Sequence, residues 1–305
     1  MNQSLTAAPH GSVTAENETA ATEHETREHL LTRAKRDAAP VLKDFVQDPD
    51  RTKTHRAGPL SVFVQHGDLR ALRAFLFLHA IISSGEGDNG WSTTLPLSVW
   101  ARAFDTTATA EPRSASTAAT KLLTRLVDRK LIARQRAGRA RKITVTLLRP
   151  DGTGEVYTRP GRGNSDRFLK LSNVYWTQGW YAKLDLPATA MLLVALHEKP
   201  GFELVTEKVP NWYGWSADTA ERGLTTLQDL DLVTVAKRTK KAPLAPSGVT
   251  TVNVYTLTGP FAHPESTPQA TSTKKRRKPP VRITKTAGSR GTRPSPAPSK
   301  TTGDD

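Results

Sequence analysis

Two similar segments of twelve residues lie about a hundred residues apart in this chain, and this repeat constrains the fold more than any other feature. The first copy is KLLTRLVDRKLI, residues 121–132, and the second is RGLTTLQDLDLV, residues 222–233. Aligned without gaps, the copies share Leu, Thr, Leu, Asp and Leu at five places. Each copy follows a segment rich in Ser, Thr and Ala, and precedes two β-branched segments separated by a turn. The repeat predicts two copies of one unit, in which a helix runs directly into a β-hairpin.

Composition and the spacing of apolar residues divide the chain into five parts. The parts are an N-terminal region that is disordered or forms short helices, two modules, a Gly/Pro-rich linker and a disordered basic tail. Their bounds are 1–58 for the N-terminal region, 60–150 for module 1, 151–167 for the linker, 168–258 for module 2 and 259–305 for the tail. The expected fold class is mainly α with small β-hairpins, that is, α+β.

Periodicity and turn residues predict the elements within these parts. Helices are expected over residues 28–46 (one or two, divided by Pro40), 69–83, 95–104, 114–129, 186–198 and 216–230, with a short helix or turn over 206–213. Thr94 is the expected N-cap of the helix at 95–104, with Pro96 in its first turn. The expected hairpin strands are 131–136 and 140–148 in module 1, and 232–237 and 249–257 in module 2, the latter pair joined by a long loop over 238–248.

The positive charge of the chain is concentrated in two segments. The net charge is +15 and the isoelectric point is near 10.2. Residues 113–142 hold ten Lys and Arg against one Asp, and residues 271–305 hold ten against two Asp. Because the first segment coincides with a repeated helix and its hairpin, the charge indicates a polyanionic partner more than solubility alone.

The repeated unit resembles the winged-helix superfamily. The pattern is a small residue, then Ser or Thr, two spaced Leu residues and an apolar pair that enters a strand. The matching residues are Ser216, Thr219, Ala220, Leu224, Leu227, Leu232 and Val233 in module 2, and Ser116, Thr117, Ala119, Leu123, Leu126, Leu131 and Ile132 in module 1. The pattern often has a Gly directly before the last Leu. This chain has Lys130 there in module 1 and Asp231 in module 2, so the end of each helix is less clearly marked in the sequence. The resemblance implies two winged-helix modules that bind double-stranded DNA, an architecture also similar to the tandem winged-helix replication initiators of plasmids.

In this resemblance, the repeated helix of module 1 lies in the major groove and the hairpin is the wing. Short hydroxyl side chains allow close approach to the bases, while Lys and Arg contact guanine or phosphate. The expected DNA-binding residues of module 1 are Arg113, Ser116, Thr117, Thr120, Lys121 and Thr124 on the helix, and Arg134, Arg136, Arg139, Arg141 and Lys142 on the wing. Six phosphate contacts would give a log–log salt slope of roughly −5.

Module 2 carries less net charge on its repeated helix, so its role has two interpretations. Its expected DNA-binding residues are Ser216, Thr219, Arg222, Lys237, Arg238, Lys240 and Lys241. Acidic Asp218 and Glu221 on the same helix could accept from cytosine, or could mark a surface that binds a second protomer. Module 1 is therefore expected to dominate non-specific affinity.

The aromatic residues of module 2 and the tail also have alternative interpretations. The aromatic residues gather at 175–181 and 212–215, and they favour a core over a platform that stacks single-stranded bases. The tail run KKRRK, residues 274–278, resembles a nuclear localisation signal, but in a disordered tail it is interpreted as an electrostatic tether.

The sequence offers no catalytic, metal or cofactor motif. There is no Cys, the eight His residues are scattered, and no Gly-rich phosphate loop occurs. No apolar run approaches the ~20 residues that cross a membrane. We therefore expect a cytoplasmic, nucleoid-associated protein that is not an enzyme and has no metal, cofactor or membrane partner. The expected function is sequence-specific binding of double-stranded DNA in transcription regulation, with a homodimer possible. The alternatives are a plasmid-type replication initiator and a protein-interaction adaptor.

Overall fold

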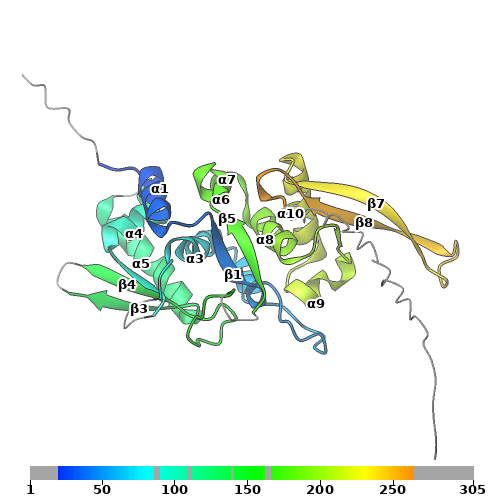
Figure 1. The fold of residues 1–305 in the computed structure, drawn as a ribbon, viewed down its shortest axis with the longest axis horizontal. Helices are drawn as coiled ribbons and strands as arrows, with labels where there is room; N and C mark the ends of the chain where they lie inside the picture. The colour runs from blue at the N-terminus through cyan, green and yellow to red at the C-terminus, as the bar shows by residue number, and fades with distance from the viewer. Residues whose placement is uncertain (1–19, 86–89, 109–110, 139–140, 162–165, 264–305) are drawn as a thin grey trace, which may run out of the picture. The chain divides into compact units, whose positions relative to one another are not determined.

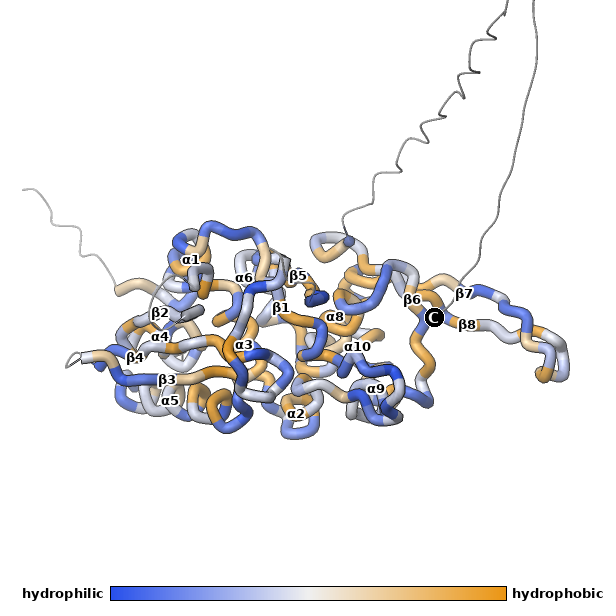
Figure 2. Tube along the Cα trace, turned by 60° about the horizontal axis from the view of Figure 1, so that its bottom comes forward, coloured by the Kyte–Doolittle hydropathy of each residue, from blue (hydrophilic) through white to orange (hydrophobic). Residues whose placement is uncertain are grey.

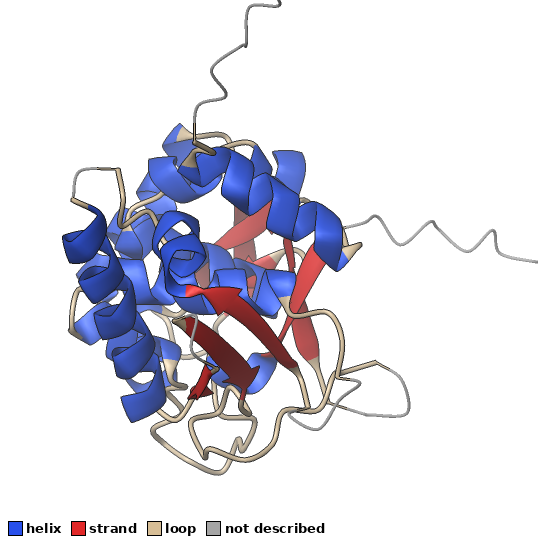
Figure 3. Ribbon diagram, turned by 90° about the vertical axis from the view of Figure 1, so that its left-hand side faces the viewer, coloured by secondary structure: helices blue, strands red, loops and turns tan. Residues whose placement is uncertain are grey.

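The computed structural model describes residues 20–85, 90–108, 111–138, 141–161 and 166–263, which form a mixed α+β fold with small antiparallel sheets (Figure 1). Figure 3 shows short strands set among more extensive helices. An N-terminal segment precedes module 1. It comprises α1 (Glu23–Ala34), β1 (Ala38–Leu42) and the 3-10 helix η1 (Lys43–Phe45).

Module 1 begins with a short helix and then has the order helix, strand, helix, helix and hairpin. Its elements are α2 (Leu60–Gln65), α3 (Leu69–Ile81), β2 (Ser92–Pro96), α4 (Leu97–Ala103), α5 (Pro112–Asp128), β3 (Ile132–Ala137) and β4 (Lys142–Leu147). The strands form an antiparallel sheet in the order β2-β4-β3. Strand β2, which precedes α4 and α5, therefore pairs with β4, the second strand of the hairpin.

Module 2 repeats this order after an additional strand and two short helices. Its elements are β5 (Phe168–Ser172), α6 (Val174–Thr177), α7 (Trp180–Lys183), α8 (Leu186–His197), β6 (Phe202–Glu203), η2 (Thr206–Lys208), α9 (Val209–Tyr213), α10 (Ala217–Asp229), β7 (Val233–Lys241), β8 (Val249–Leu257) and η3 (Gly259–Phe261). The sheet order is β6-β8-β7, which matches that of module 1. The repeat in the sequence is thus a repeat of topology.

The repeated helices α5 and α10 each bury one apolar stripe. The buried residues are Ala115, Ala119, Leu122, Leu123 and Leu126 in α5, and Ala220, Gly223, Leu224 and Leu227 in α10. Gly223 allows α10 to approach α8 closely, because a Cβ there would lie 2.4 Å from the backbone oxygen of Pro187. Predicted helices at 69–83, 114–129, 186–198 and 216–230 are confirmed within a few residues.

Both repeated helices end in the same left-handed turn, at the positions where the sequence departs from the usual Gly. Lys130 has φ 57° and Asp231 has φ 56°. After α5 the amide of Lys130 donates to the backbone oxygen of Val127 at 2.8 Å, and that of Leu131 donates to Leu126 at 3.1 Å. Corresponding bonds follow α10, so both exits are Schellman turns made without Gly.

The two modules share one hydrophobic core. Strand β1, from the N-terminal segment, pairs antiparallel with β5 of module 2, while α3 packs on β1 and α8 packs on β5. One cluster of buried side chains includes Phe75 of α3 and Leu192 of α8. Polar contacts also join the modules, since the Gln65 side chain donates to the backbone oxygen of Gly214 at 2.7 Å. Figure 2 shows α8 as largely hydrophobic and β7 as largely hydrophilic.

Three predicted elements were wrong, two of them because their strand partners lie far away in the sequence. Residues 38–42 are a strand rather than part of a helix, and Pro40 lies opposite Lys170 of β5. Thr94 belongs to β2 and bonds Thr144 of β4 at 2.7 Å, so it is not an N-cap, and α4 starts at Leu97. Strand β7 runs to Lys241, so residues 238–241 of the expected loop are paired with β8.

The segment between the modules is anchored to the fold by a buried tyrosine and a group of ion pairs. Tyr157 is 3% exposed and donates to the backbone oxygen of Pro40 at 3.5 Å. The Arg149 guanidinium contacts the carboxylates of Asp44, Asp151 and Asp166 at 2.6–3.2 Å. Composition alone does not reveal these contacts.

The ends of the folded part differ from expectation. Phe261, in the expected tail, is 3% exposed and contacts the ring of Trp180. In the N-terminal region, residues 20–58 include the helix α1 and the strand β1, and they bury Leu30 and Phe45. The remaining residues of the two terminal regions, 1–19 and 264–305, lie outside the described residues.

Candidate nucleic-acid interface

One face of α5 carries the polar residues predicted to read DNA. Its buried stripe turns toward the core, which leaves the opposite face to solvent. Arg113, Thr117 and Lys121 are exposed, and Ser116, Thr120 and Thr124 are half-buried. Pro112 occupies the first turn of α5, where its missing N–H costs no helix hydrogen bond. The sequence thus fixes both the start of α5 and the face it presents.

The hairpin β3–β4 turns two arginines toward α5. Arg134 lies opposite Val145 and Arg136 opposite Ile143, so both share the sheet face of the buried pair Ile132 and Leu147. The Arg134 guanidinium donates to the backbone oxygen of Thr120 at 3.1 Å. The predicted alternation of Arg134 and Arg136 on one face is confirmed, and that face is the one beside α5.

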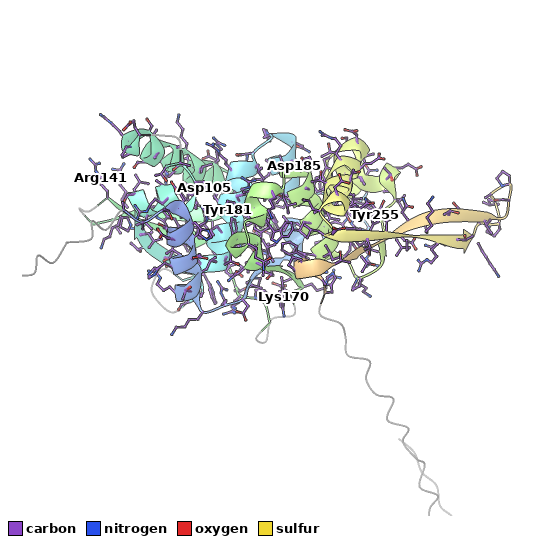
Figure 4. The ribbon with its side chains drawn as sticks, turned by 90° about the horizontal axis from the view of Figure 1, so that it is seen from above. Asp105, Arg141, Lys170, Tyr181, Asp185 and Tyr255 are labelled. Atoms are coloured by element: carbon purple, nitrogen blue, oxygen red, sulfur yellow. The ribbon has the colours of Figure 1, made fainter. Side chains whose placement is uncertain are left out.

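The hairpin turn supplies further cations. Lys142 lies opposite Ala137 and therefore on the other sheet face, while Arg141 lies in the turn with φ 50°. The backbone oxygen of Arg141 accepts from the amide of Leu97, which ties the turn to the start of α4. Figure 4 shows Arg141 at the outer end of the hairpin. Arg139 lies outside the described residues.

Two adjoining hollows join the helix face to the hairpin. The first, of about 770 Å³, is lined mainly by α5, including Arg113, Ser116 and Thr117. The second, of about 530 Å³, is lined mainly by the hairpin, including Arg134, Arg136 and Lys142. Leu97, Thr120 and Arg141 line both hollows. The structure therefore brings ten of the eleven predicted residues of module 1 to one helix face and the adjoining hairpin.

The cations of this region keep their charge available. Among the described residues, no carboxylate forms an ion pair with Arg113, Lys121, Arg134, Arg136, Arg141 or Lys142. Two arginines near the C-terminal end of α5 instead share one carboxylate. Arg125 and Arg129 pair with the buried Asp68 at 2.7 and 2.9 Å. We name the six cations with available charge the module 1 cation set.

The corresponding cations of module 2 are divided. Arg222 pairs with Asp218 one helical turn earlier at 3.3 Å, and both Arg238 and Lys240 pair with Glu203 of β6. Lys237 and Lys241 lie on the opposite face of β7, the face that also carries the buried Val233. Within the described part of the chain, neither of these two lysines forms an ion pair. Module 2 therefore offers less unneutralised charge than module 1.

The two hydroxyl residues predicted to bind DNA in module 2 cap a helix. The Ser216 hydroxyl oxygen accepts from the amide of Thr219 at 3.1 Å, and the two hydroxyls lie 2.8 Å apart. This is an N-cap arrangement, which satisfies an otherwise free amide of the first turn. Both contacts lie within the first turn of α10.

The aromatic residues of module 2 belong largely to the core. Tyr175, Trp176, Tyr213 and Trp215 are buried. Trp176 packs edge-on against Phe77 of α3, with ring centroids 5.1 Å apart. These contacts favour the core interpretation over a stacking platform for single strands.

Sequence reasoning missed several residues of the interface. Leu97, Pro112 and Ile143 line the hollows with apolar atoms. The Glu203 carboxylate pairs with two of the four cations of β7. Ile143 could have been predicted from strand alternation, because it lies opposite Arg136 and therefore on the same sheet face. Glu203 carries no such signal, because its partners lie 35 and 37 residues later in the chain.

Comparison of the chain with family models, curated proteins and solved structures gives no match. Among the residues that the structure describes, no helix is long and apolar enough to span a bilayer. In the same part of the chain, no three His, Asp or Glu side chains are grouped to hold a metal ion.

Proposed function

We propose that the chain binds double-stranded DNA in a sequence-specific manner and that each of its modules is a winged helix. In module 1, α5 would enter the major groove and the β3–β4 hairpin would be the wing. The shared order of helices and strands in the two modules supports this assignment, because it is the arrangement that the resemblance implies. The observation that carries the proposal is the module 1 cation set around the two hollows.

The charge of this set predicts a measurable salt dependence. If each of the six cations neutralises one phosphate, the log–log slope of affinity against salt is about −5. The ion pairs of Arg222, Arg238 and Lys240 lower the contribution expected from module 2. Module 1 should therefore account for most of the non-specific affinity.

The test removes charge from the wing. In the full chain, Arg136→Ala, Arg141→Ala and Lys142→Ala together should make the slope shallower by about 2.7. A control variant with Lys170, Lys183 and Lys199 replaced by Ala removes the same charge from β5, α7 and the end of α8. The control should keep the slope, because these lysines lie outside the hollows.

Fluorescence anisotropy with a labelled random duplex, at several salt concentrations, measures both variants. No binding to any duplex in dilute buffer would overturn the proposal. Equal slopes in the wing variant and the unaltered chain would also contradict it, and would favour the adaptor alternative.

Transcription regulation is the process we propose for this binding, and plasmid-type replication initiation is the second candidate. The shared core favours the second candidate, because two modules held together by one hydrophobic cluster suit one bipartite site on a single chain. A footprint distinguishes them. An inverted repeat over a promoter supports the regulator, and several direct repeats support the initiator.

A further inference from the structure

The three threonines along the exposed face of α5 all use their hydroxyl hydrogen within the helix. Thr117 donates to the backbone oxygen of Arg113 at 3.0 Å, Thr120 to Ser116 at 2.9 Å and Thr124 to Thr120 at 2.9 Å. A hydroxyl in this state can only accept a hydrogen bond from a base, unless it gives up the helix bond. It therefore does not suit the guanine edge, which presents only the acceptors O6 and N7.

Asn and Gln bind adenine by two hydrogen bonds, and the carboxylates of Asp and Glu accept from cytosine. Apart from one terminal residue, α5 lacks all of these side chains. The helix contains no Asn, Gln or Glu, and its one Asp is Asp128 at the C-terminal end. Its base-reading groups are therefore Arg and Lys, which suit guanine, and the hydroxyl and methyl groups of Ser and Thr. The threonine methyl is one of the groups that contact the 5-methyl of thymine in the major groove.

The surroundings of Thr120 are apolar on one side. Thr120 lines both hollows together with Leu97, and Ile143 lines the second of them. The backbone oxygen of Thr120 is also occupied, since it accepts from Arg134 as well as from Thr124. A base edge that reaches this part of α5 meets methyl groups and hydroxyl acceptors, flanked by cations that hold the phosphates.

We infer that Thr117, Thr120 and Thr124 form a methyl-reading row, which selects thymine through its 5-methyl group and makes A·T pairs the preferred contact of α5. The adenine of such a pair can donate from its N6 amino group to these hydroxyls, but cytosine can do the same from N4, so the selection rests on the 5-methyl group of thymine. The inference rests on the proposed function, because it specifies which duplex α5 prefers.

The test uses uracil, which lacks only the 5-methyl group of thymine. A duplex selected by the full chain from a random pool is remade with single thymine-to-uracil replacements. Affinity should fall about fourfold at each thymine that the row contacts, the factor expected for one buried methyl-sized group. It should stay unchanged at thymines outside the contact.

Two substitutions at one position separate the methyl group from the hydroxyl. Thr120→Ser keeps the hydroxyl and removes the methyl, so it should abolish the difference between thymine and uracil at its contact. Thr120→Val keeps a methyl and removes the hydroxyl, so it should preserve that difference. Thr226→Ser is the matched control on α10, because Thr226 makes the same bond to Arg222 at 3.1 Å. Thermal denaturation of both Ser variants measures the cost of shortening such a side chain.

The outcomes separate this inference from the proposed function. Binding to the selected duplex with no loss at any uracil would overturn the methyl-reading row and leave DNA binding intact. A triple variant that carries Thr117→Ser, Thr120→Ser and Thr124→Ser should lose the thymine preference. If this variant keeps the preference, the inference is also overturned. Failure to bind any duplex in dilute buffer would overturn the proposed function itself.

Discussion

Acidification should destabilise the fold through one buried histidine. His79 of α3 is 1% exposed, and its ring packs edge-on against Phe75 and Tyr157 at centroid distances of 4.7 and 5.3 Å. Burial, with a smaller effect from the Arg36 charge, lowers the pKa of His79 from 6.5 to about 3. The native protein therefore holds this ring neutral, while the unfolded chain protonates it below pH 6.5.

The sign and size of the effect follow from this difference. Because only the unfolded state takes up the proton, the His79 contribution is constant above pH 6.5 and lowers the unfolding free energy as the pH falls from 6.5 toward 3. At pH 5 the loss is about 2 kcal/mol, since each pH unit below the unfolded pKa corresponds to 1.36 kcal/mol. A folded pKa one unit higher would leave this value nearly unchanged.

The assay is urea denaturation of the unaltered chain and of His79→Leu, each at pH 7 and pH 5. Leu keeps the site apolar and removes the titration, while carboxylates contribute equally to both proteins. The unaltered chain should lose about 2 kcal/mol more than the variant between the two pH values. Equal losses would refute the reasoning, as would an NMR titration in which the His79 ring protonates near pH 6.5 in the folded protein.

Three further substitutions test the packing of the repeated helices. Gly223→Ala should lower the unfolding free energy by about 2 kcal/mol, despite the helix propensity of Ala, because its Cβ meets the Pro187 backbone. A higher unfolding free energy in chemical denaturation would contradict this close approach. Lys130→Gly should raise stability by up to about 1 kcal/mol, because φ 57° suits Gly, and a lower melting temperature would argue against strain there. Asp68→Asn should cost about 3 kcal/mol by leaving Arg129 without its carboxylate, and an unchanged denaturation midpoint would show that this pair adds no stability.

The sequence predicted elements whose signal is local. The apolar stripe of α5, with Ala115, Ala119 and Leu126, repeats with the helical period, so the helix and its exposed face could be found without the structure. The alternation of Arg134 and Arg136 likewise predicted which side chains share a strand face. For the same reason the sequence could indicate which residues lie on the exposed face of α5 and on the hairpin, but not whether they contact a ligand.

Features that depend on distant partners could not be predicted in this way. Pro40 indicated a helix break, but its strand is defined by pairing with Lys170, which local periodicity does not encode. The charge of Arg238 looked available in the sequence, yet Glu203 neutralises it from another strand. Lys130 in place of the usual Gly left the helix exit uncertain in the sequence, although Lys130 adopts the left-handed conformation and two backbone bonds complete the turn.

The β1–β5 sheet has a consequence for dissecting the molecule. A fragment that spans residues 60–150 would lack β1, and one that spans residues 168–258 would keep β5 but lose its partner strand. In the second fragment, Leu169 and Leu171, both 1% exposed in the whole chain, would lie on an unpaired strand edge. Halves cut at the apparent linker should therefore aggregate or bind each other, and mixing the two halves with residues 20–58 retained should restore a soluble complex.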